Sequence, residues 1–294
     1  MENVLLIMNP YAGKKQAKPH LADIIELFGK NGMMVTAHMT SAQGDAIKTA
    51  EQYAGEFDKV ICIGGDGTLN EVINGILNGG HKTPIGYIPA GSTNDFATSL
   101  SIPKNIIKAA ENIVNGKTIQ LDVGRFNGRY FSYVTSFGAF TKTSYSAPQN
   151  RKNTWGRLAY IMEGIKDLSS IKPIHMRLEA PDAAYEDDYI FGAVTNSTSV
   201  AGILSFDPAV VSMSDGMFEL FLVKYPKNLL ELNDCVRAIL TQQYDTCENI
   251  TFATAPRGTF YCENDIDWTV DGEQAQATCI NHVDNIHHAI TLIL

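Results

Sequence analysis

Two hydrophobic periodicities divide the chain. Up to about residue 120, short apolar runs alternate with stretches in which apolar residues recur every three or four positions. Buried strands and amphipathic helices produce these two patterns. The predicted strands are Val4–Met8, Met33–Met39, Val60–Ile63 and Ile85–Ile88, and the predicted helices are Ala17–Lys30, Asp45–Ala54, Thr68–Leu77 and Ile106–Val114. This alternation predicts an α/β domain with an open, largely parallel, Rossmann-like sheet covered by helices on both faces.

From about Ile119 the pattern changes to strands separated by Asn-Gly, Asp-Gly and Pro turn signals. The predicted strands are Leu121–Phe126, Tyr130–Thr135, Met176–Leu178, Ile190–Thr195, Val210–Met213, Phe218–Val223, Ile250–Ala253, Phe260–Cys262 and Trp268–Val270, with helices near Leu158–Leu168 and Leu229–Leu240. This texture predicts a second, mainly antiparallel β domain. The last apolar run, Ala289–Leu294, suits a buried strand of either domain.

Composition narrows the function classes. The chain has 294 residues, which suggests about two domains. Its formal net charge of −9 argues against broad, nonspecific nucleic-acid binding, because that needs a basic surface. No run approaches the ~20 apolar residues that span a bilayer, and the N-terminus does not resemble a signal peptide. We therefore expect any contact with a membrane to be peripheral.

The cysteines and histidines do not suggest a metal site. The five cysteines form no C-x-x-C pair, which is typical of reduced thiols in a cytosolic protein. His287 and His288 are adjacent, so on a strand their side chains would point to opposite faces. We interpret these two histidines as surface or interface residues.

One segment has the pattern of a phosphate site. Val60–Ile63 runs into Gly64-Gly65-Asp66-Gly67-Thr68, and a helical pattern follows. The glycines let backbone N–H groups approach an anion, Thr68 is the predicted N-cap, and the helix points its positive end at the turn. Asp66 would repel phosphate unless it holds a divalent cation or accepts the acceptor's proton. The alternative is a tight turn in which Asp66 is only a turn former.

Two further loops follow neighbouring strands. Gly91–Asp95 supplies hydroxyl and amide groups at a helix start, and Asn9–Gly13 with Lys14 and Lys15 follows the first strand. The Asn9–Gly13 loop lacks the Gly-Lys-Ser/Thr ending of a Walker A loop, but its glycine and lysines suit nucleotide phosphates. In a parallel sheet all these loops lie at the carboxyl edge, where ligands bind. An ordinary helix cap and a solvated turn remain the alternatives for the two loops.

Together, the three segments resemble the diacylglycerol-kinase catalytic-domain superfamily, and most closely its bacterial soluble lipid kinases. The family pattern is N-P-x-[AS]-G, G-G-D-G-T and G-[ST]-x-N-D, which Asn9–Gly13, Gly64–Thr68 and Gly91–Asp95 match in order and spacing. The resemblance covers essentially the whole chain. It implies a nucleotide-binding domain over 1–120 plus a returning strand at about 288–294, a β-rich acceptor domain over 121–287, and ATP in the cleft between them.

The resemblance also implies which residues contact ATP and Mg²⁺. The implied nucleotide-binding residues are Asn9, Pro10, Tyr11, Ala12, Gly13, Lys14, Thr40, Gly64, Gly65, Gly67, Thr68, Leu69, Asn70, Glu71, Ser92, Thr93, Asn94 and Asp95. Asp215 matches a family segment that holds a structural Mg²⁺ in some members, with a carbonyl near Met217 as partner. Ser212 stands where some members have a further acid. The alternative for Asp215-Gly216 is a hairpin turn.

A last family segment, Asp271-Gly272-Glu273, carries the implied catalytic base. In the family its Glu is the proton acceptor, so Glu273 is the favoured base, Asp271 is a second catalytic candidate, and Asp66 organises metal and nucleotide. Asp66 as the base is the alternative. Asp271-Gly272 also reads as a plain hairpin turn.

The resulting expectation is an ATP- and Mg²⁺-dependent lipid kinase that phosphorylates a hydroxyl of diacylglycerol or a related lipid. The segment Thr141–Met162 holds four basic residues, no acid and interfacial aromatics, which suits an anionic membrane surface; a solvated loop is the alternative. We expect a cytoplasmic protein, peripheral at the inner face of the membrane. A homodimer is left open.

Two other functions fit parts of the pattern. An NAD kinase-like phosphotransferase would act on a soluble acceptor with the same ATP-binding architecture. A nonenzymatic nucleotide- or lipid-binding protein would keep the fold without turnover. The presence of Asp66, Asn94, Asp95 and Glu273 argues against the second alternative, because a degenerate site would have lost some of them.

Overall fold

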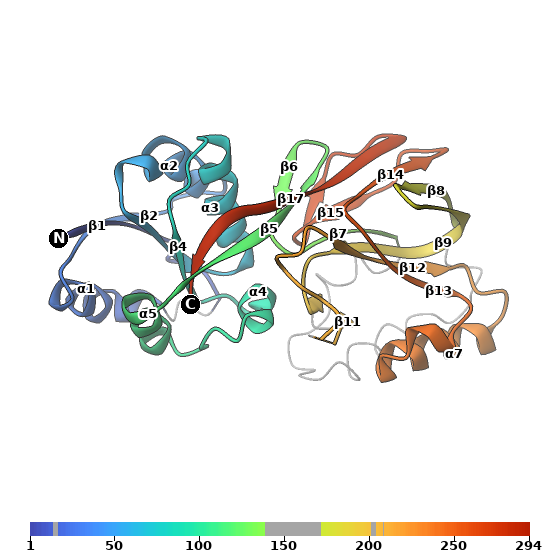
Figure 1. The fold of residues 1–294 in the computed structure, drawn as a ribbon, viewed down its shortest axis with the longest axis horizontal. Helices are drawn as coiled ribbons and strands as arrows, with labels where there is room; N and C mark the ends of the chain where they lie inside the picture. Colours follow the sequence, from blue (N-terminus) through green and yellow to red (C-terminus); the bar gives the residue numbers. More distant parts are fainter. Residues whose placement is uncertain (14–16, 139–171, 201–203, 208) are drawn as a thin grey trace. The chain divides into compact units, whose positions relative to one another are not determined.

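The computed structural model describes residues 1–13, 17–138, 172–200, 204–207 and 209–294 (Figure 1). The chain forms two compact units: unit 1 is Met1–Val123 with Ile286–Leu294, and unit 2 is Gly124–Asn285. Two strands, β5 (Thr118–Phe126) and β17 (Ile280–Ile293), carry the chain from one unit into the other. Lys14, Lys15, the segment Thr141–Met162 and the helix predicted near Leu158–Leu168 lie outside the described residues.

Unit 1 is built on a parallel sheet with the strand order β2-β1-β3-β4-β17. The strands that precede β17 are β1 (Glu2–Met8), β2 (Met33–Met39), β3 (Lys59–Gly64) and β4 (Ile85–Pro89). Every residue of β4 is buried, as expected for a strand covered on both faces. At its end, β17 pairs in parallel with β4 through Leu292 and Ile293. The predicted open parallel sheet is confirmed.

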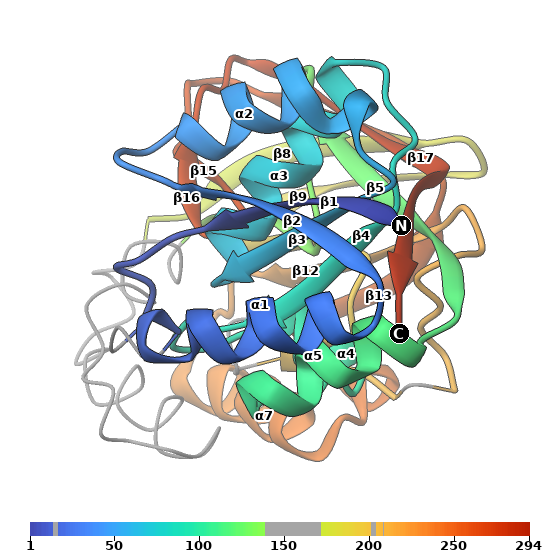
Figure 2. The ribbon, with the colours of Figure 1, turned by 90° about the vertical axis from the view of Figure 1, so that its left-hand side faces the viewer.

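Helices cover both faces of this sheet. Figure 2 shows α2 (Asp45–Tyr53) and α3 (Asp66–Asn78) on one face, and α1 (Leu21–Lys30) and α5 (Ile106–Asn115) on the other. The buried residues of α5 recur at helical spacing, namely Ile106, Ala109, Ala110 and Ile113. A short helix, α4 (Asp95–Ser99), follows the loop after β4. None of the described helices is both long and apolar enough to cross a membrane.

Unit 2 is mainly antiparallel. Its strands are β6 (Arg129–Phe131), β7 (Val134–Gly138), β8 (Ile174–Ala180), β9 (Ala183–Thr195), β12 (Phe218–Lys224), β13 (Ile250–Ala255), β14 (Arg257–Cys262), β15 (Trp268–Val270) and β16 (Glu273–Ala275), with two short strands, β10 (Ser199–Val200) and β11 (Leu204–Ser205). The main path runs β16-β15-β7-β9-β8-β14-β17, and β12 joins β9 to β13. One helix, α7 (Leu229–Thr241), matches its prediction closely.

Aromatic side chains fill the core of unit 2. Trp268 of β15 is fully buried, with its ring centroid 4.8–5.0 Å from those of Phe126, Phe137 and Phe260. Aromatic pairs at these distances stabilise the fold by more than the burial of their apolar area alone. Trp268 therefore anchors the start of the β15–β16 hairpin, which carries the predicted base.

Two predicted strands differ from the structure. Tyr130–Thr135 is divided between β6 and β7, because the N–H groups of Ser132 and Tyr133 donate to Asp271 instead of to a neighbouring strand. The other predicted strand is absent. Val210–Met213 forms no strand, because the backbone N–H groups of Val210 and Val211 both donate to the carbonyl of Asp207, at 2.8 and 3.1 Å. These bonds close a turn. Burial of Val211 and Met213 explains the misleading apolar pattern, since a buried turn and a buried strand share it.

Candidate active site

The predicted nucleotide loops meet at the carboxyl edge of the unit 1 sheet. Because β1, β3 and β4 are parallel and adjacent along the path, the loops that follow them emerge together. Backbone bonds link their starts: the N–H of Asn9 donates to Ile63 O at 2.9 Å, and that of Ala90 donates to Gly64 O at 2.7 Å. The N–H of buried Thr40, after β2, donates to Met8 O at 2.9 Å.

Glycines allow these loops to pack backbone against backbone. A Cβ on Gly91 would lie 2.5 Å from the Cα of Gly65. A Cβ on Gly13 would lie 2.5 Å from the carbonyl oxygen of Ala90, and Gly13 has φ +54°, in the left-handed region. Any side chain at Gly13 or Gly91 would push the loops apart, so the motif glycines serve close approach of three backbone segments.

Asp66 ties the glycine loop to the loop after β4. It is the first residue of α3, and its Oδ2 and Oδ1 accept the N–H groups of Asp95 (3.1 Å) and Phe96 (3.2 Å), at the start of α4. The carboxylate thus caps a neighbouring helix, while the side chain remains partly exposed. Asp66 is therefore held in a fixed position at the sheet edge.

Thr68 does not have its predicted role as N-cap. The helix begins two residues earlier, so Gly65 is the N-cap. The Thr68 hydroxyl instead accepts a hydrogen bond from Asn9 Nδ2 at 3.2 Å. Asn9 also closes its own loop, because its Oδ1 accepts the N–H of Tyr11 at 2.9 Å. Asn9 and Thr68 together hold the first loop against α3.

The loop after β4 is shaped by Asn94. This residue has φ +56°, and its amide side chain closes the loop: Oδ1 accepts from Gly91 N at 2.9 Å and Nδ2 donates to Gly91 O at 3.0 Å. Asp95 is buried. Ser92 and Thr93 are exposed, so solvent reaches their hydroxyls. Their contact with a nucleotide stays a prediction.

Three residues of α3 that are predicted to contact the nucleotide also stabilise the fold. Leu69 is fully buried, so its side chain packs in the core. Buried Asn70 accepts a hydrogen bond from Asn74 at 3.1 Å. Glu71 Oε1 accepts the N–H of Gly44 at 2.8 Å and so fixes the start of α2. Their nucleotide contacts stay predictions.

In unit 2, Asp271 and Gly272 form the tight turn of the β15–β16 hairpin. Val270 pairs with Glu273, which leaves a two-residue turn whose φ angles, +45° and +84°, are both positive. Asp271 is buried and accepts hydrogen bonds from Ser132 N (2.6 Å), Ser132 Oγ (2.7 Å), Tyr133 N (3.0 Å) and Val134 N (3.0 Å). Burial raises the pKa of Asp271, and these hydrogen bonds oppose that shift. Asp271 thus holds the hairpin in place.

We expect Asp271→Asn to lower the free energy of unfolding by about 2 kcal/mol, measured by urea denaturation. Asparagine tolerates the left-handed backbone, so the lower free energy of unfolding would come from the hydrogen bonds. An amide NH₂ at this position would face backbone N–H donors and could not accept from them. Asp182→Asn, in the exposed β8–β9 turn, is the matched control and should be nearly neutral. Equal stability of the two variants would contradict the anchoring role.

Glu273 lies just beyond this turn and reaches solvent. Its side chain is 41% exposed, and Oε2 accepts a hydrogen bond from Arg129 Nη2 at 2.7 Å. Of the two acids in the Asp-Gly-Glu segment, only Glu273 is therefore accessible to a substrate. Sequence reasoning missed Arg129, because nothing in the pattern links it to an acid 144 positions away.

The predicted metal loop of unit 2 precedes β12. Asp215 is exposed, and its Oδ1 accepts the N–H of Met217 at 3.0 Å. The Met217 carbonyl accepts a hydrogen bond from Asn285 Nδ2 at 3.0 Å, and Ser212 Oγ accepts a longer one from Ser214 N at 3.4 Å. The chain turns at Asp215-Gly216, where Gly216 has φ +78°, but residues 209–217 form no strand, so this turn does not close a hairpin.

Two buried oxygens beside this loop were not foreseen. Within the described residues, Glu219 Oε2 and Asn285 Oδ1 are buried without a hydrogen-bond partner. Burial, with Asp215 nearby, raises the pKa of Glu219 to about 8. Carboxylate, carbonyl and amide oxygens are the ligands that Mg²⁺ prefers, so this donor set fits the expected ion. The sequence signal was an acid inside the apolar run of β12.

Comparisons with known proteins agree with these features. Residues 3–126 match the family model of the diacylglycerol kinase catalytic domain. The diacylglycerol kinase of Bacillus subtilis is 34% identical over 275 residues, which cover 93% of this chain and 90% of that protein. The diacylglycerol kinase of Staphylococcus epidermidis is 32% identical over 269 residues, covering 91% and 84%.

Solved structures give the same result. The crystal structure of a Bacillus anthracis protein assigned to the diacylglycerol kinases superposes with a TM-score of 0.84 at 27% identity. The match covers 99% of this chain and 96% of that one. On the three loops, the two-unit fold and these relatives, the chain belongs to the diacylglycerol kinase family.

Proposed function

We propose that this protein transfers the γ-phosphoryl group of ATP to a hydroxyl of diacylglycerol or a closely related lipid. The observation that carries the proposal is the convergence of the three glycine loops at one sheet edge, with Asp66 fixed among them. The relatives named diacylglycerol kinase supply the acceptor class.

The nucleotide side belongs to unit 1. The backbone N–H groups of the first turn of α3 are the ones we expect to bind phosphate oxygens, because a helix N-terminus favours negative charge. Ser92 and Thr93 add exposed hydroxyl donors. Mg²⁺, when bound, would neutralise charge on the phosphate oxygens, and Asp66 is the acid we propose to hold it. Asp215, with Ser212, the Met217 carbonyl and the orphaned oxygens of Glu219 and Asn285, would hold the structural Mg²⁺.

On the acceptor side, Glu273 is the proposed proton acceptor. It takes the proton of the lipid hydroxyl as the hydroxyl oxygen bonds to the γ-phosphorus and the bond from that phosphorus to ADP breaks. Arg129 fixes the orientation of the Glu273 carboxylate. Asp66 remains the alternative base. A lipid acceptor further implies a cytoplasmic protein that contacts the membrane surface peripherally.

Label transfer from γ-labelled ATP tests the function. With Mg²⁺, we expect label to enter diacylglycerol presented in mixed micelles and to be recovered in the organic phase as a phosphorylated lipid. NAD offered without lipid should remain unlabelled. Label in NADP would replace the lipid acceptor with a soluble one, and ATP binding without transfer to either would favour a nonenzymatic binding protein.

A further inference from the structure

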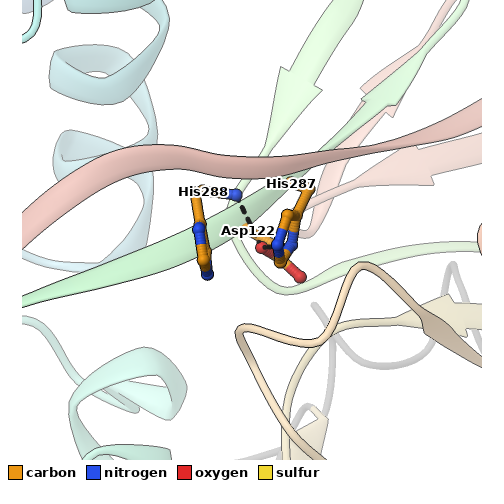
Figure 3. A group of neighbouring side chains, drawn as sticks. All are labelled: Asp122, His287 and His288. Carbon is orange, nitrogen blue, oxygen red and sulfur yellow. Dashed lines mark hydrogen bonds and ion pairs between the residues drawn. The ribbon is translucent and has the colours of Figure 1, made fainter.

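An unassigned cluster lies where the chain leaves unit 1. Asp122 of β5 is buried, and its Oδ1 accepts hydrogen bonds from His287 Nδ1 at 2.9 Å and from the backbone N–H of His288 at 2.7 Å. The two imidazole rings stack with their centroids 3.7 Å apart. Figure 3 shows both rings on the same side of the β17 ribbon.

This arrangement overturns the expectation that the two histidines diverge. Consecutive side chains of a regular strand point to opposite faces. His288, however, has φ +51°, in the left-handed region, which cancels the alternation at this point of β17. Residues other than glycine rarely adopt this backbone conformation, and strained conformations of this kind are concentrated at functional sites. The left-handed conformation of His288 therefore brings two imidazole rings to the same carboxylate.

We propose that Asp122, His287 and His288 bind a divalent transition-metal ion. One ligand atom from each residue lies within 4.8 Å of the others. For metal bonds of about 2.1 Å, the 2.9 Å between His287 Nδ1 and Asp122 Oδ1 subtends an angle of about 90° at the ion. The ion replaces the proton that His287 now donates to Asp122. His288 supplies the third ligand, because a nitrogen of its exposed ring lies within 4.8 Å of the other two ligand atoms.

The donor set selects the class of metal. Two imidazoles with one carboxylate suit Zn²⁺, Ni²⁺, Co²⁺ or Fe²⁺, whereas Mg²⁺ prefers oxygen ligands. The site therefore differs in chemistry from the oxygen-lined positions expected for the kinase's Mg²⁺. The buried carboxylate fixes one side, and the exposed imidazoles give an ion access from solvent.

The ion would cross-link the two strands that connect the units. Asp122 lies two residues before Gly124, where β5 enters unit 2, and His287 lies two residues after Asn285, where β17 leaves it. A metal held by both strands ties together the two points at which the chain passes between the units. This consequence does not depend on the proposed kinase reaction.

Nickel binding by the full-length protein tests the site. After treatment with a chelator, the protein is titrated with NiCl₂ in excess Mg²⁺ and followed by calorimetry. We expect a site for one Ni²⁺ per chain that Mg²⁺ does not displace, weakened at least about tenfold by His288→Gly and by His287→Gln. Glycine suits φ +51°, so His288→Gly should fold at least as well as the wild type.

His20→Gln is the matched control, because His20 lies 3.6 Å from Asp23 without a second imidazole, and this change should leave Ni²⁺ binding unaltered. At the same concentration, Ni²⁺ should raise the melting temperature of the wild type by more than that of His288→Gly. Absence of a site that survives excess Mg²⁺, or equal affinity in the wild type and both His287 and His288 variants, would overturn the proposal. The assay contains neither ATP nor lipid, so its result is independent of the proposed function.

Discussion

Glu273→Gln lowers kcat for lipid phosphorylation by about 10²–10⁴-fold, the range contributed by a general base, while the KM for ATP stays near the wild-type value. Glutamine keeps the length of the side chain and an oxygen that accepts from Arg129, so the hairpin keeps its geometry. What it loses is the ability to take the proton of the acceptor hydroxyl. Steady-state kinetics with diacylglycerol in mixed micelles measures both constants.

Asp187→Asn is the matched control for this prediction. Asp187 is also in unit 2, pairs with Lys224 at 2.9 Å and is 42% exposed, close to the exposure of Glu273. Loss of a half-exposed ion pair costs little stability, so this control should retain kcat. If Glu273→Gln turned over as fast as Asp187→Asn, Glu273 would not be the base, and Asp66 would take its place as the candidate.

The sequence predicted the convergence of the three glycine loops well because its signals are local. Each loop there directly follows an apolar strand, and parallel order alone brings Asn9, Gly65 and Gly91 together. The helix-start error at Thr68 is small. The helix begins at Asp66, whose carboxylate caps α4, and helix ends are the boundaries that sequence patterns locate least exactly.

Unit 2 was harder to predict because its contacts are distant in sequence. Asp271 bonds to residues about 138 positions earlier, and a turn signal alone does not show that its carboxylate is buried. Only Ala289–Leu294 was recognised in β17, which begins at Ile280. The missed part is polar, and partners far along the chain satisfy it: Asn281 accepts from Asn127 at 2.8 Å. The left-handed residue His288 has no sequence signature at all.

Asp66→Asn should lower kcat/KM by on the order of 10³-fold, because it removes the negative charge and also disturbs the position of the loop that the carboxylate holds. Both carboxylate oxygens accept backbone N–H groups at the start of α4, and an amide nitrogen in either place would face a donor. The Gly91–Asp95 loop would then shift relative to the glycine loop. The lost charge should also raise the Mg²⁺ concentration needed for half-maximal activity, which a Mg²⁺ titration at saturating ATP measures.

Asp58→Asn is the control that distinguishes a loss of catalysis from the loss of a backbone hydrogen bond. Asp58 Oδ2 accepts the N–H of Asn3 at 2.7 Å, at the beginning of β1, the end of that strand away from the nucleotide loops. Losing such a bond costs on the order of 1 kcal/mol in either variant, so both should melt at similarly lowered temperatures. Only Asp66→Asn should lose activity. If the two variants kept the same activity, Asp66 would be a helix cap and no more, and phosphoryl transfer would need another acid at the sheet edge.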